Sequence, residues 1–319
     1  MIVVLSIFGL LLGLILLIML SDVFVDAASS LAIKLKVPKM LIALTIAAFG
    51  TCVPELAISF NSIRDGNIDM TMANVIGSSI VNILLIVGVS TIVRPIGVKE
   101  RVVKKELPLL FIVTTAFFVL ISDSLFSETA VNGLTRADAI MLLCWFVVFI
   151  LYILRIVRRN KNEDDEQESK YSLKASIILI IVSLLIIVVA SDVVVDSAVY
   201  IAEMFGISQK IISMTIIVIG TSLPELTMTV LSARKGEFDM AVGNIIGTNI
   251  FNMCVVLGLP IAIYGGITSN SFNLIDTSMV LISSVFFFLF GTSDRKLSRR
   301  EGIFMVLVFV FYYGYVIFA

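Results

Sequence analysis

The chain consists mostly of long apolar runs, and the first of them already restricts the fold. Residues 2–20 contain no charged side chain, and a helix of that length crosses the roughly 30 Å hydrocarbon core of a bilayer. Of the 319 residues, 59% are hydrophobic and only 15% are charged. A soluble domain of this size needs more charge to cover its surface. The sequence therefore predicts an integral membrane protein.

Ten apolar segments predict ten transmembrane helices and an all-α fold. They fall near residues 2–33, 40–63, 70–93, 107–122, 138–157, 173–205, 210–233, 240–264, 273–291 and 302–318. The longest hydrophilic stretch is 158–172, whose composition is that of a solvated linker.

Lysine and arginine are concentrated in alternate connections between these segments. If the N-terminus lies outside, only Arg64, Arg136 and Lys210 fall on the outer side, and the other 20 of the 23 basic residues fall on the cytoplasmic side. Cytoplasmic loops carry such an excess of basic residues. We therefore expect a multi-pass protein of the cell membrane, with both termini outside and the 158–172 linker in the cytoplasm.

A shift of 170 residues aligns the first half of the chain with the second. Over residues 21–90 the alignment needs no gap, gives roughly 26 identities in 70 positions, and lays Pro54-Glu55-Leu56 on Pro224-Glu225-Leu226. Each half holds five predicted spans, an odd number, so the second copy enters the membrane from the opposite side. The sequence predicts two inverted repeats, 1–157 and 173–319, with a substrate site between them near the midplane.

The two copies share one polar motif inside an apolar run. Residues 47–59 read AAFGTCVPELAIS and residues 217–229 read IVIGTSLPELTMT. An acid at the centre of a membrane helix costs about 2.5–3.5 kcal/mol, and no lysine or arginine lies in the middle of any span. Glu55 and Glu225 must be neutralised by protons, by bound metal cations or by one replacing the other. The alternative is a pair of protonated glutamates hydrogen-bonded within a packed bundle.

The residues around these acids all offer oxygen. Pro54 and Pro224 each remove a backbone donor, which predicts free carbonyl groups around Ala48–Thr51 and Val218–Thr221, with Ala48 and Val218 as candidate ligands. Hydroxyl and amide groups complete the candidate ligands: Thr51, Thr221, Ser222, Ser78, Thr248, Asn82 and Asn252. Such a set favours hard cations such as Ca²⁺ and Na⁺. The chain has no histidine, so zinc, copper and iron sites are not expected, nor is any cofactor.

Two further repeated features have simpler interpretations. The acid pairs Asp22/Asp26 and Asp192/Asp196 are spaced i, i+4 near a span end, where they line an ion entrance or are simply solvated. Gly77 and Gly247 open a small-residue face that is typical of close helix packing.

The paired motifs GTCVPEL with GSSIVN, and GTSLPEL with GTNIFN, resemble the two alpha repeats of the Ca²⁺/cation antiporter superfamily. The chain is most similar to its prokaryotic sodium/calcium exchangers. The resemblance implies a secondary active antiporter that extrudes Ca²⁺ from the cytoplasm in exchange for Na⁺ by alternating access. It implies these ions and the bilayer as partners, with no enzyme activity, nucleic acid or obligatory protein partner.

Carried over by position, Glu55 and Glu225 resemble the Ca²⁺-coordinating acids of the family, and the hydroxyl and amide residues resemble further ligands. Two positions depart from the family pattern. Cys52 stands where the second repeat has serine, and Asn252 stands where some relatives have aspartate. A Ca²⁺/H⁺ antiporter or a K⁺-dependent Ca²⁺ antiporter is the alternative, although the motif of the H⁺-coupled branch is absent. A cation channel and a membrane-bound enzyme are further alternatives.

The charge distribution generates a labelling prediction. Single cysteines introduced at Asn162 and Asn270 should react with impermeant thiol reagents from opposite sides of the membrane, because the two positions lie in connections of opposite charge character. Labelling of both positions from the same side would contradict the topology and the inverted repeat with it.

Overall fold

The computed structural model describes residues 2–66, 68–125, 132–159, 169–207, 212–268 and 274–318, and these are almost entirely helical. The first half contains eight α-helices: α1 (Ile2–Leu35), α2 (Lys39–Ile42), α3 (Ala48–Thr51), α4 (Val53–Arg64), α5 (Ile68–Ile80), α6 (Gly88–Val93), α7 (Leu107–Ile121) and α8 (Arg136–Arg159). The second half contains α9 (Leu173–Met204), α11 (Val218–Thr221), α12 (Leu223–Lys235), α13 (Phe238–Phe251), α14 (Gly258–Tyr264), α15 (Leu274–Ser293) and α16 (Arg299–Phe318).

Short segments of π-helix connect several of these helices. They are η1 (Ala43–Ala47), η2 (Val81–Val87), η3 (Val102–Glu106), η5 (Ile212–Ile217) and η6 (Asn252–Val256), and η4 (Asp123–Leu125) is a 3₁₀ turn. The strands are β1 (Ile96–Gly97), β2 (Gly133–Leu134), β3 (Ile267–Thr268) and β4 (Lys296–Leu297).

Two of the predicted spans are broken in the middle. The helix that ends at Thr51 and the helix that starts at Val53 meet at a bend of 44°, and the equivalent bend between Thr221 and Leu223 is 50°. A proline in the first turn after each break explains its position, because proline is tolerated at a helix start but disrupts a helix interior.

Seven helices among the described residues are long and apolar enough to cross a membrane, and the two bent pairs raise the number to nine. The predicted span near 107–122 forms α7, whose 15 residues are fewer than the roughly 20 that the hydrocarbon core requires. It follows η3 without a break. The all-helical membrane fold is confirmed, and the number of ten spans stays a prediction.

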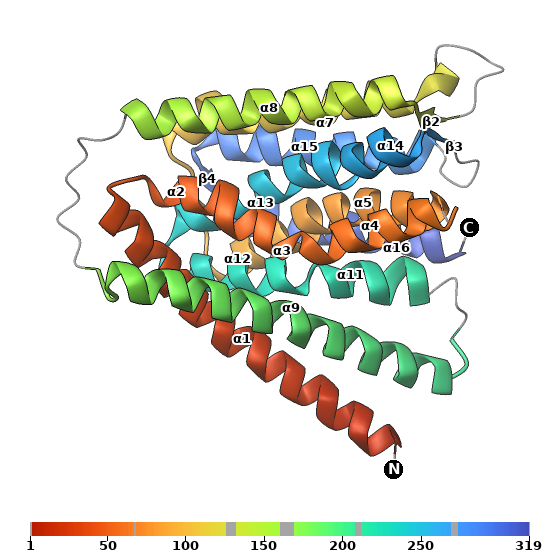
Figure 1. The fold of residues 1–319 in the computed structure, drawn as a ribbon, viewed down its shortest axis with the longest axis horizontal. Coiled ribbons are helices and arrows are strands. Elements are labelled where there is room, and N and C mark those ends of the chain that lie inside the picture. The colour runs from red at the N-terminus through yellow and green to blue at the C-terminus, as the bar shows by residue number, and fades with distance from the viewer. Residues whose placement is uncertain are drawn as a thin grey trace.

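Two small antiparallel ribbons join the halves of the chain. Strand β1 pairs with β4, and β2 pairs with β3. Strands β1 and β3 follow α6 and α14, which align under the 170-residue shift, and β2 and β4 precede α8 and α16. The two ribbons lie at opposite ends of the helices, and both chain ends lie at one end (Figure 1).

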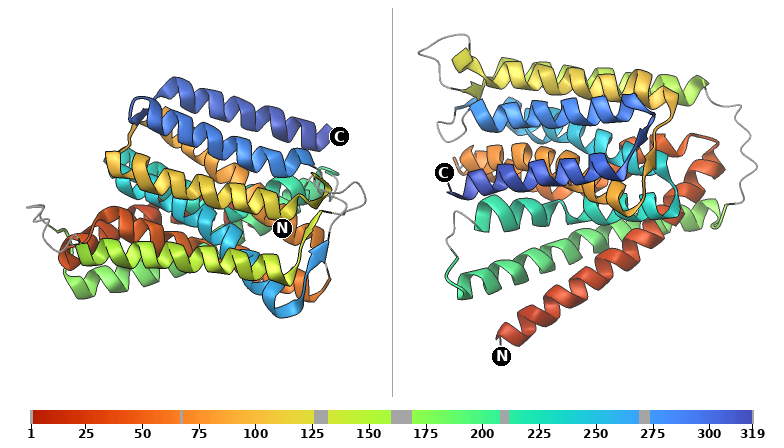
Figure 2. Two further views of the ribbon diagram at one scale, coloured as in Figure 1. Left: turned by 90° about the horizontal axis from the view of Figure 1, so that it is seen from above. Right: turned by 180° about the vertical axis from the view of Figure 1, so that it is seen from behind.

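Helices α1 and α9 lie together along one side of the molecule (Figures 1 and 2). They cross closely at Gly13, where an added Cβ atom would lie 2.6 Å from Val194 Cγ2 and 3.0 Å from the Ala190 carbonyl oxygen. Buried apolar residues form two clusters. The larger one contains no residue of this pair, and the smaller one joins α1 and α9 to the helices next to them. The long pair is therefore packed as a layer on the remaining helices.

The glycines of α5 and α13 let the two halves approach closely, as the sequence predicts. A Cβ atom on Gly77 would lie 2.6 Å from Val218 Cγ1, and one on Gly247 would lie 2.7 Å from both Ala48 Cβ and the Leu44 carbonyl oxygen. Each half thus places its unbroken third helix against the broken helix of the other half.

This packing generates a stability prediction. Gly247→Ala should destabilise the fold by about 1–3 kcal/mol through overpacking, because its new methyl group would meet the backbone of Leu44. The measurement is the midpoint of thermal unfolding of purified protein in detergent. The control is Gly314→Ala, whose new methyl group has no atom within 4 Å; equal midpoints for the two variants would contradict the packing.

Candidate metal-ion site

Two glutamates occupy equivalent positions at the helix breaks. Glu55 lies in the first turn of α4 and Glu225 in the first turn of α12, and their exposed fractions are 0% and 1%. The free N–H groups at a helix N-terminus carry partial positive charge, which stabilises a nearby carboxylate. The breaks therefore place two carboxylates, each at a helix start, in the interior of the molecule.

Neither carboxylate forms an ion pair among the described residues. All four of their oxygen atoms are buried and accept no hydrogen bond, and the ion pairs of the structure involve other acids. The two groups are also close enough to interact electrostatically with each other. Buried charges need a partner of opposite sign, so this arrangement fits a bound cation.

The third spans contribute buried neutral oxygen atoms. Ser78 lies in α5 and Thr248 in α13. The amide Asn82 is the second residue of η2, and Asn252 is the first residue of η6. All four are at most 1% exposed. Within the described ranges their side-chain polar atoms have no hydrogen-bond partner, although buried polar groups are usually paired. They are free to coordinate an ion.

The hydroxyl groups at the breaks donate to the backbone and keep their lone pairs. Thr51 Oγ1 lies 3.2 Å from the Ala47 and Ala48 carbonyl oxygens, and Thr221 Oγ1 lies 3.1 Å from that of Val218. Ser222 Oγ donates to the same Val218 oxygen at 3.2 Å. A hydroxyl that donates one hydrogen bond can still accept or coordinate. Thr51 also lies beside Glu225 of the other half.

Within the predicted ranges 48–51 and 218–221, the carbonyl groups of Ala48 and Val218 already accept hydrogen bonds. The Ala48 oxygen accepts the Cys52 N–H at 3.3 Å, in addition to the Thr51 hydroxyl, and the Val218 oxygen accepts two hydroxyl groups. A proline removes the donor to the residue four positions earlier, which is glycine in both motifs. Each of these two oxygens has two lone pairs and already faces two donors, so its role as an ion ligand stays a prediction.

Cys52 lies inside this constellation. Its buried Sγ is 4.0 Å from the Thr248 carbonyl oxygen, and both glutamates interact with it electrostatically. The thiol therefore stands where the second half places the Ser222 hydroxyl, and it is a poor ligand for hard ions.

Sequence reasoning missed Asn249 and the π-helical segments. Asn249 is fully buried, donates to the Ile245 carbonyl at 2.8 Å, and has no partner for Oδ1 within the part of the chain described. The available signal was its position directly after Thr248. The segments η1 and η5 precede the two breaks, and η2 and η6 carry the two amides. Such bulges are frequent at functional sites, but apolar periodicity does not reveal them.

The combined donor set is two carboxylates with hydroxyl, amide and carbonyl oxygens. Among the described residues, no group of three or more His, Cys, Asp or Glu side chains is placed to hold a metal ion, and such a group is the pattern of many transition-metal sites. Hard cations instead accept neutral oxygen ligands around one or two carboxylates. The geometry is suited to Ca²⁺ and Na⁺.

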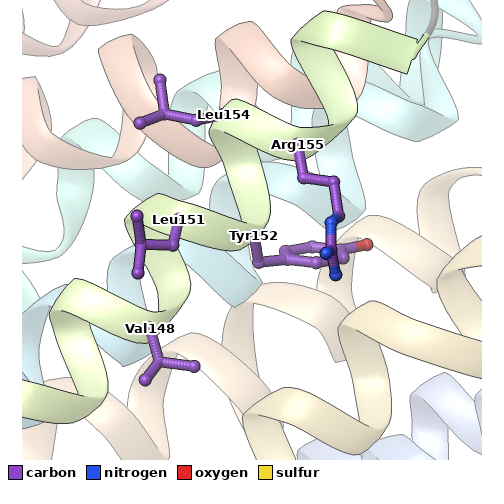
Figure 3. Close-up of a pocket in the computed structure, with 5 residues that line it drawn as sticks. All are labelled: Val148, Leu151, Tyr152, Leu154 and Arg155. Carbon is purple, nitrogen blue, oxygen red and sulfur yellow. The ribbon is translucent and has the colours of Figure 1, made fainter.

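A surface groove of about 560 Å³ lies away from these residues on α8. It is lined by Val148, Leu151, Tyr152, Leu154 and Arg155 (Figure 3). Three of the five are apolar side chains on the exposed face of a predicted span, as expected of a surface in contact with lipid. This groove has none of the features of the candidate ion site.

The site generates a binding prediction. Glu55→Gln and Glu225→Gln should each weaken Ca²⁺ binding at least about tenfold, because each removes one of two carboxylates that have no other countercharge. The measurement is ⁴⁵Ca²⁺ binding to purified protein. The control is Asp65→Asn, at the exposed end of the same helix as Glu55; unchanged affinity in either glutamine variant would favour the protonated, purely structural pair.

Comparison with known proteins places this geometry in a family. Residues 5–155 and 175–318 match the family described as sodium/calcium exchanger protein. The chain is 34% identical over 313 residues to the putative antiporter CaxA of Alkalimonas amylolytica, with 95% of each chain covered. It is 29% identical to the sodium/calcium exchanger MaX1 of Methanosarcina acetivorans, with 94% of this chain and 95% of the relative covered.

A solved structure of the sodium-calcium exchanger NCX_Mj, soaked with Na⁺ and Sr²⁺, has the same fold. The TM-score is 0.83 at 28% sequence identity, and 97% of each chain is covered. The family match extends over both halves of the chain, including both glutamate motifs. This protein belongs to the sodium/calcium exchanger family, which consists of membrane transporters and not of enzymes.

Proposed function

We propose that this protein is a secondary active antiporter that extrudes Ca²⁺ from the cytoplasm in exchange for Na⁺ by alternating access. The observation that carries the proposal is the pair of buried carboxylates, one from each half, without a protein cation among the described residues. The names of MaX1 and NCX_Mj support the choice of the two ions.

Charge balance explains why such a site would exchange one cation for another. The alternative is that the site releases its cation and changes sides without a bound ion. When ionised, Glu55 and Glu225 carry two negative charges, which one Ca²⁺ or a set of Na⁺ ions can neutralise. Leaving both charges unpaired at this depth is costly. The site therefore favours a change of side only when one or the other cargo is bound, and this couples the two fluxes.

The alternation itself would use the two halves as inverted five-span repeats around a shared site. The ribbons at opposite ends and the mutual packing of Gly77 and Gly247 against the opposite broken helices support this arrangement. The basic residues assign both termini to the outside and the 158–172 linker to the cytoplasm. Residues 160–168 of that linker lie outside the described residues.

Sodium is the better supported coupling ion. The buried amides of Asn82 and Asn252 do not titrate, and the chain has no histidine. A dedicated proton carrier would have to be one of the glutamates that also holds Ca²⁺. The hydroxyl groups of Thr51, Thr221 and Ser222, together with Ser78 and Thr248, offer neutral oxygen ligands for a monovalent hard cation.

The proposal is tested by ⁴⁵Ca²⁺ movement into vesicles under imposed gradients. A Na⁺ gradient at equal pH should drive Ca²⁺ movement without added K⁺, and a pH gradient without Na⁺ should not. Vesicles that carry Glu225→Gln provide the inactive control.

Each other outcome identifies an alternative. Transport driven by the pH gradient alone would assign the protein to the proton-coupled antiporters, and a strict K⁺ requirement would assign it to the K⁺-dependent ones. Ca²⁺ flux that needs no counter-ion would indicate a channel.

A further inference from the structure

Lysines tie one end of α1 to its neighbours. Lys235, the last residue of α12, places Nζ 2.9 Å from Asp22 Oδ1 and 2.5 Å from Asp26 Oδ1. The same Nζ donates to the Asp22 carbonyl oxygen at 2.9 Å. Gly236 ends the helix in the left-handed region at φ +82°, which only glycine adopts readily. This turn fixes the direction of Lys235 against α1.

Two more lysines surround the same point. Lys39 Nζ donates to Glu237 at 2.7 and 2.9 Å, and Ser29 of α1 donates to Glu237 Oε1 at 3.2 Å. Lys170, before α9, pairs with Asp26 Oδ2 at 2.6 Å. We call the cluster of Lys39, Lys170 and Lys235 with Asp22, Asp26 and Glu237 the lysine latch; four of its residues line a cavity of about 290 Å³.

The other half repeats the acids without the lysines. The 170-residue shift places Asp192 and Asp196 of α9 at the positions of Asp22 and Asp26, but it places Asp65 at the position of Lys235 and Gln209 at that of Lys39. In the ranges that the structure describes, neither Asp192 nor Asp196 forms an ion pair. Among the described residues, ion pairs therefore hold α1 at one end, and no matching set of ion pairs is found on α9.

Between the latch and Glu225, helix α1 packs against α12. There the Ser21 hydroxyl of α1 contacts Thr227 Oγ1 of α12 at 2.7 Å, and Thr227 follows Glu225 by two residues. Ser21 is fully buried in this contact. Access to Glu225 along this face of α12 requires α1 to move away from it, which breaks the bonds of Lys235.

We propose that the lysine latch is a built-in bias that holds this transporter closed at the latch end. This proposal rests on the proposed function and on its membrane orientation, in which the distribution of basic residues assigns the latch end to the cytoplasm. In this account Lys235 is a positioning residue that touches no transported ion. The latch makes the state that is open to the cytoplasm the less populated one when no ion gradient is applied, so the ion site is accessible mainly from the outside.

The environment of the latch makes such an effect measurable. The side chains of Lys235 and Asp26 are 24% and 20% exposed, and those of Lys39 and Glu237 are 17% and 25% exposed. Ion pairs that are partly withdrawn from water are screened less than fully exposed ones. Loss of Lys235 removes contacts that exist in only one of the two states, which shifts their populations.

The test measures access to Ser21 directly. Ser21→Cys is combined with Cys144→Ser, which removes the one exposed native cysteine, and inside-out vesicles without Na⁺ or Ca²⁺ receive an impermeant thiol reagent. Adding Lys235→Gln should raise the labelling rate of the cysteine at position 21 by about three- to tenfold. Lys235→Arg, which keeps the charge, should leave the rate close to that of the parent.

Two matched control variants distinguish loss of the latch from a general destabilisation of the protein caused by removing a charge. Asp196→Asn removes the equivalent acid on α9, and Lys104→Gln removes an exposed ion pair with Glu100 at the surface; neither should change the labelling rate. Equal rates in Lys235→Gln and its parent, or an equal rise in Lys104→Gln, would overturn the latch.

Transport gives an independent readout of the same bias. In vesicles of both orientations, Lys235→Gln should raise the apparent Ca²⁺ affinity at the cytoplasmic face and lower it at the outer face, because one state is populated at the expense of the other. Changes in the same direction at both faces would contradict the latch. If the parent does not exchange Ca²⁺ for Na⁺, the proposed function fails, but the labelling result still decides whether Lys235 holds α1.

Discussion

Two buried carboxylates that have no protein countercharge among the described residues are the constraint on which the rest of the structure depends. Glu55 and Glu225 are as deeply buried as any core side chain, yet their oxygens have no hydrogen-bond partner within the described chain. Burial of that kind is stable only when something else supplies the charge. In the proposed function a transported cation supplies it, and the same requirement would make two kinds of cation compete for one place.

The fold meets this constraint with interrupted helices. The breaks at Cys52 and Ser222 turn each glutamate into a first-turn residue, so the start of a helix faces each carboxylate. Gly77 and Gly247 then bring an unbroken helix of one half against the broken helix of the other. Oxygen atoms from four helical segments are therefore brought together, and no loop has to cross the apolar interior. Irregular backbone is tolerated there only where it lines a cavity or packs within protein.

The sequence alone predicted the membrane class, the repeated acids and the packing of the two glycines, because apolar length and a fixed 170-residue register are visible in a single chain. It did not predict the π-helical segments or the acceptor bonds of Ala48 and Val218, since these depend on local hydrogen-bond choices that periodicity does not encode. The sequence predicts Asp22 and Asp26 as entrance or solvated acids. Their pairing with Lys235 joins residues more than 200 positions apart and is visible only in the three-dimensional structure.

The most direct test of the central claim is the position of a bound divalent cation. Crystals of this protein soaked in Sr²⁺, a heavier analogue of Ca²⁺, should give an anomalous difference peak between the carboxylates of Glu55 and Glu225. The account predicts that the peak disappears in the Glu55→Gln and Glu225→Gln proteins while the fold is retained. A peak elsewhere, or an unchanged peak in both variants, would contradict the claim that the cargo supplies the missing charge.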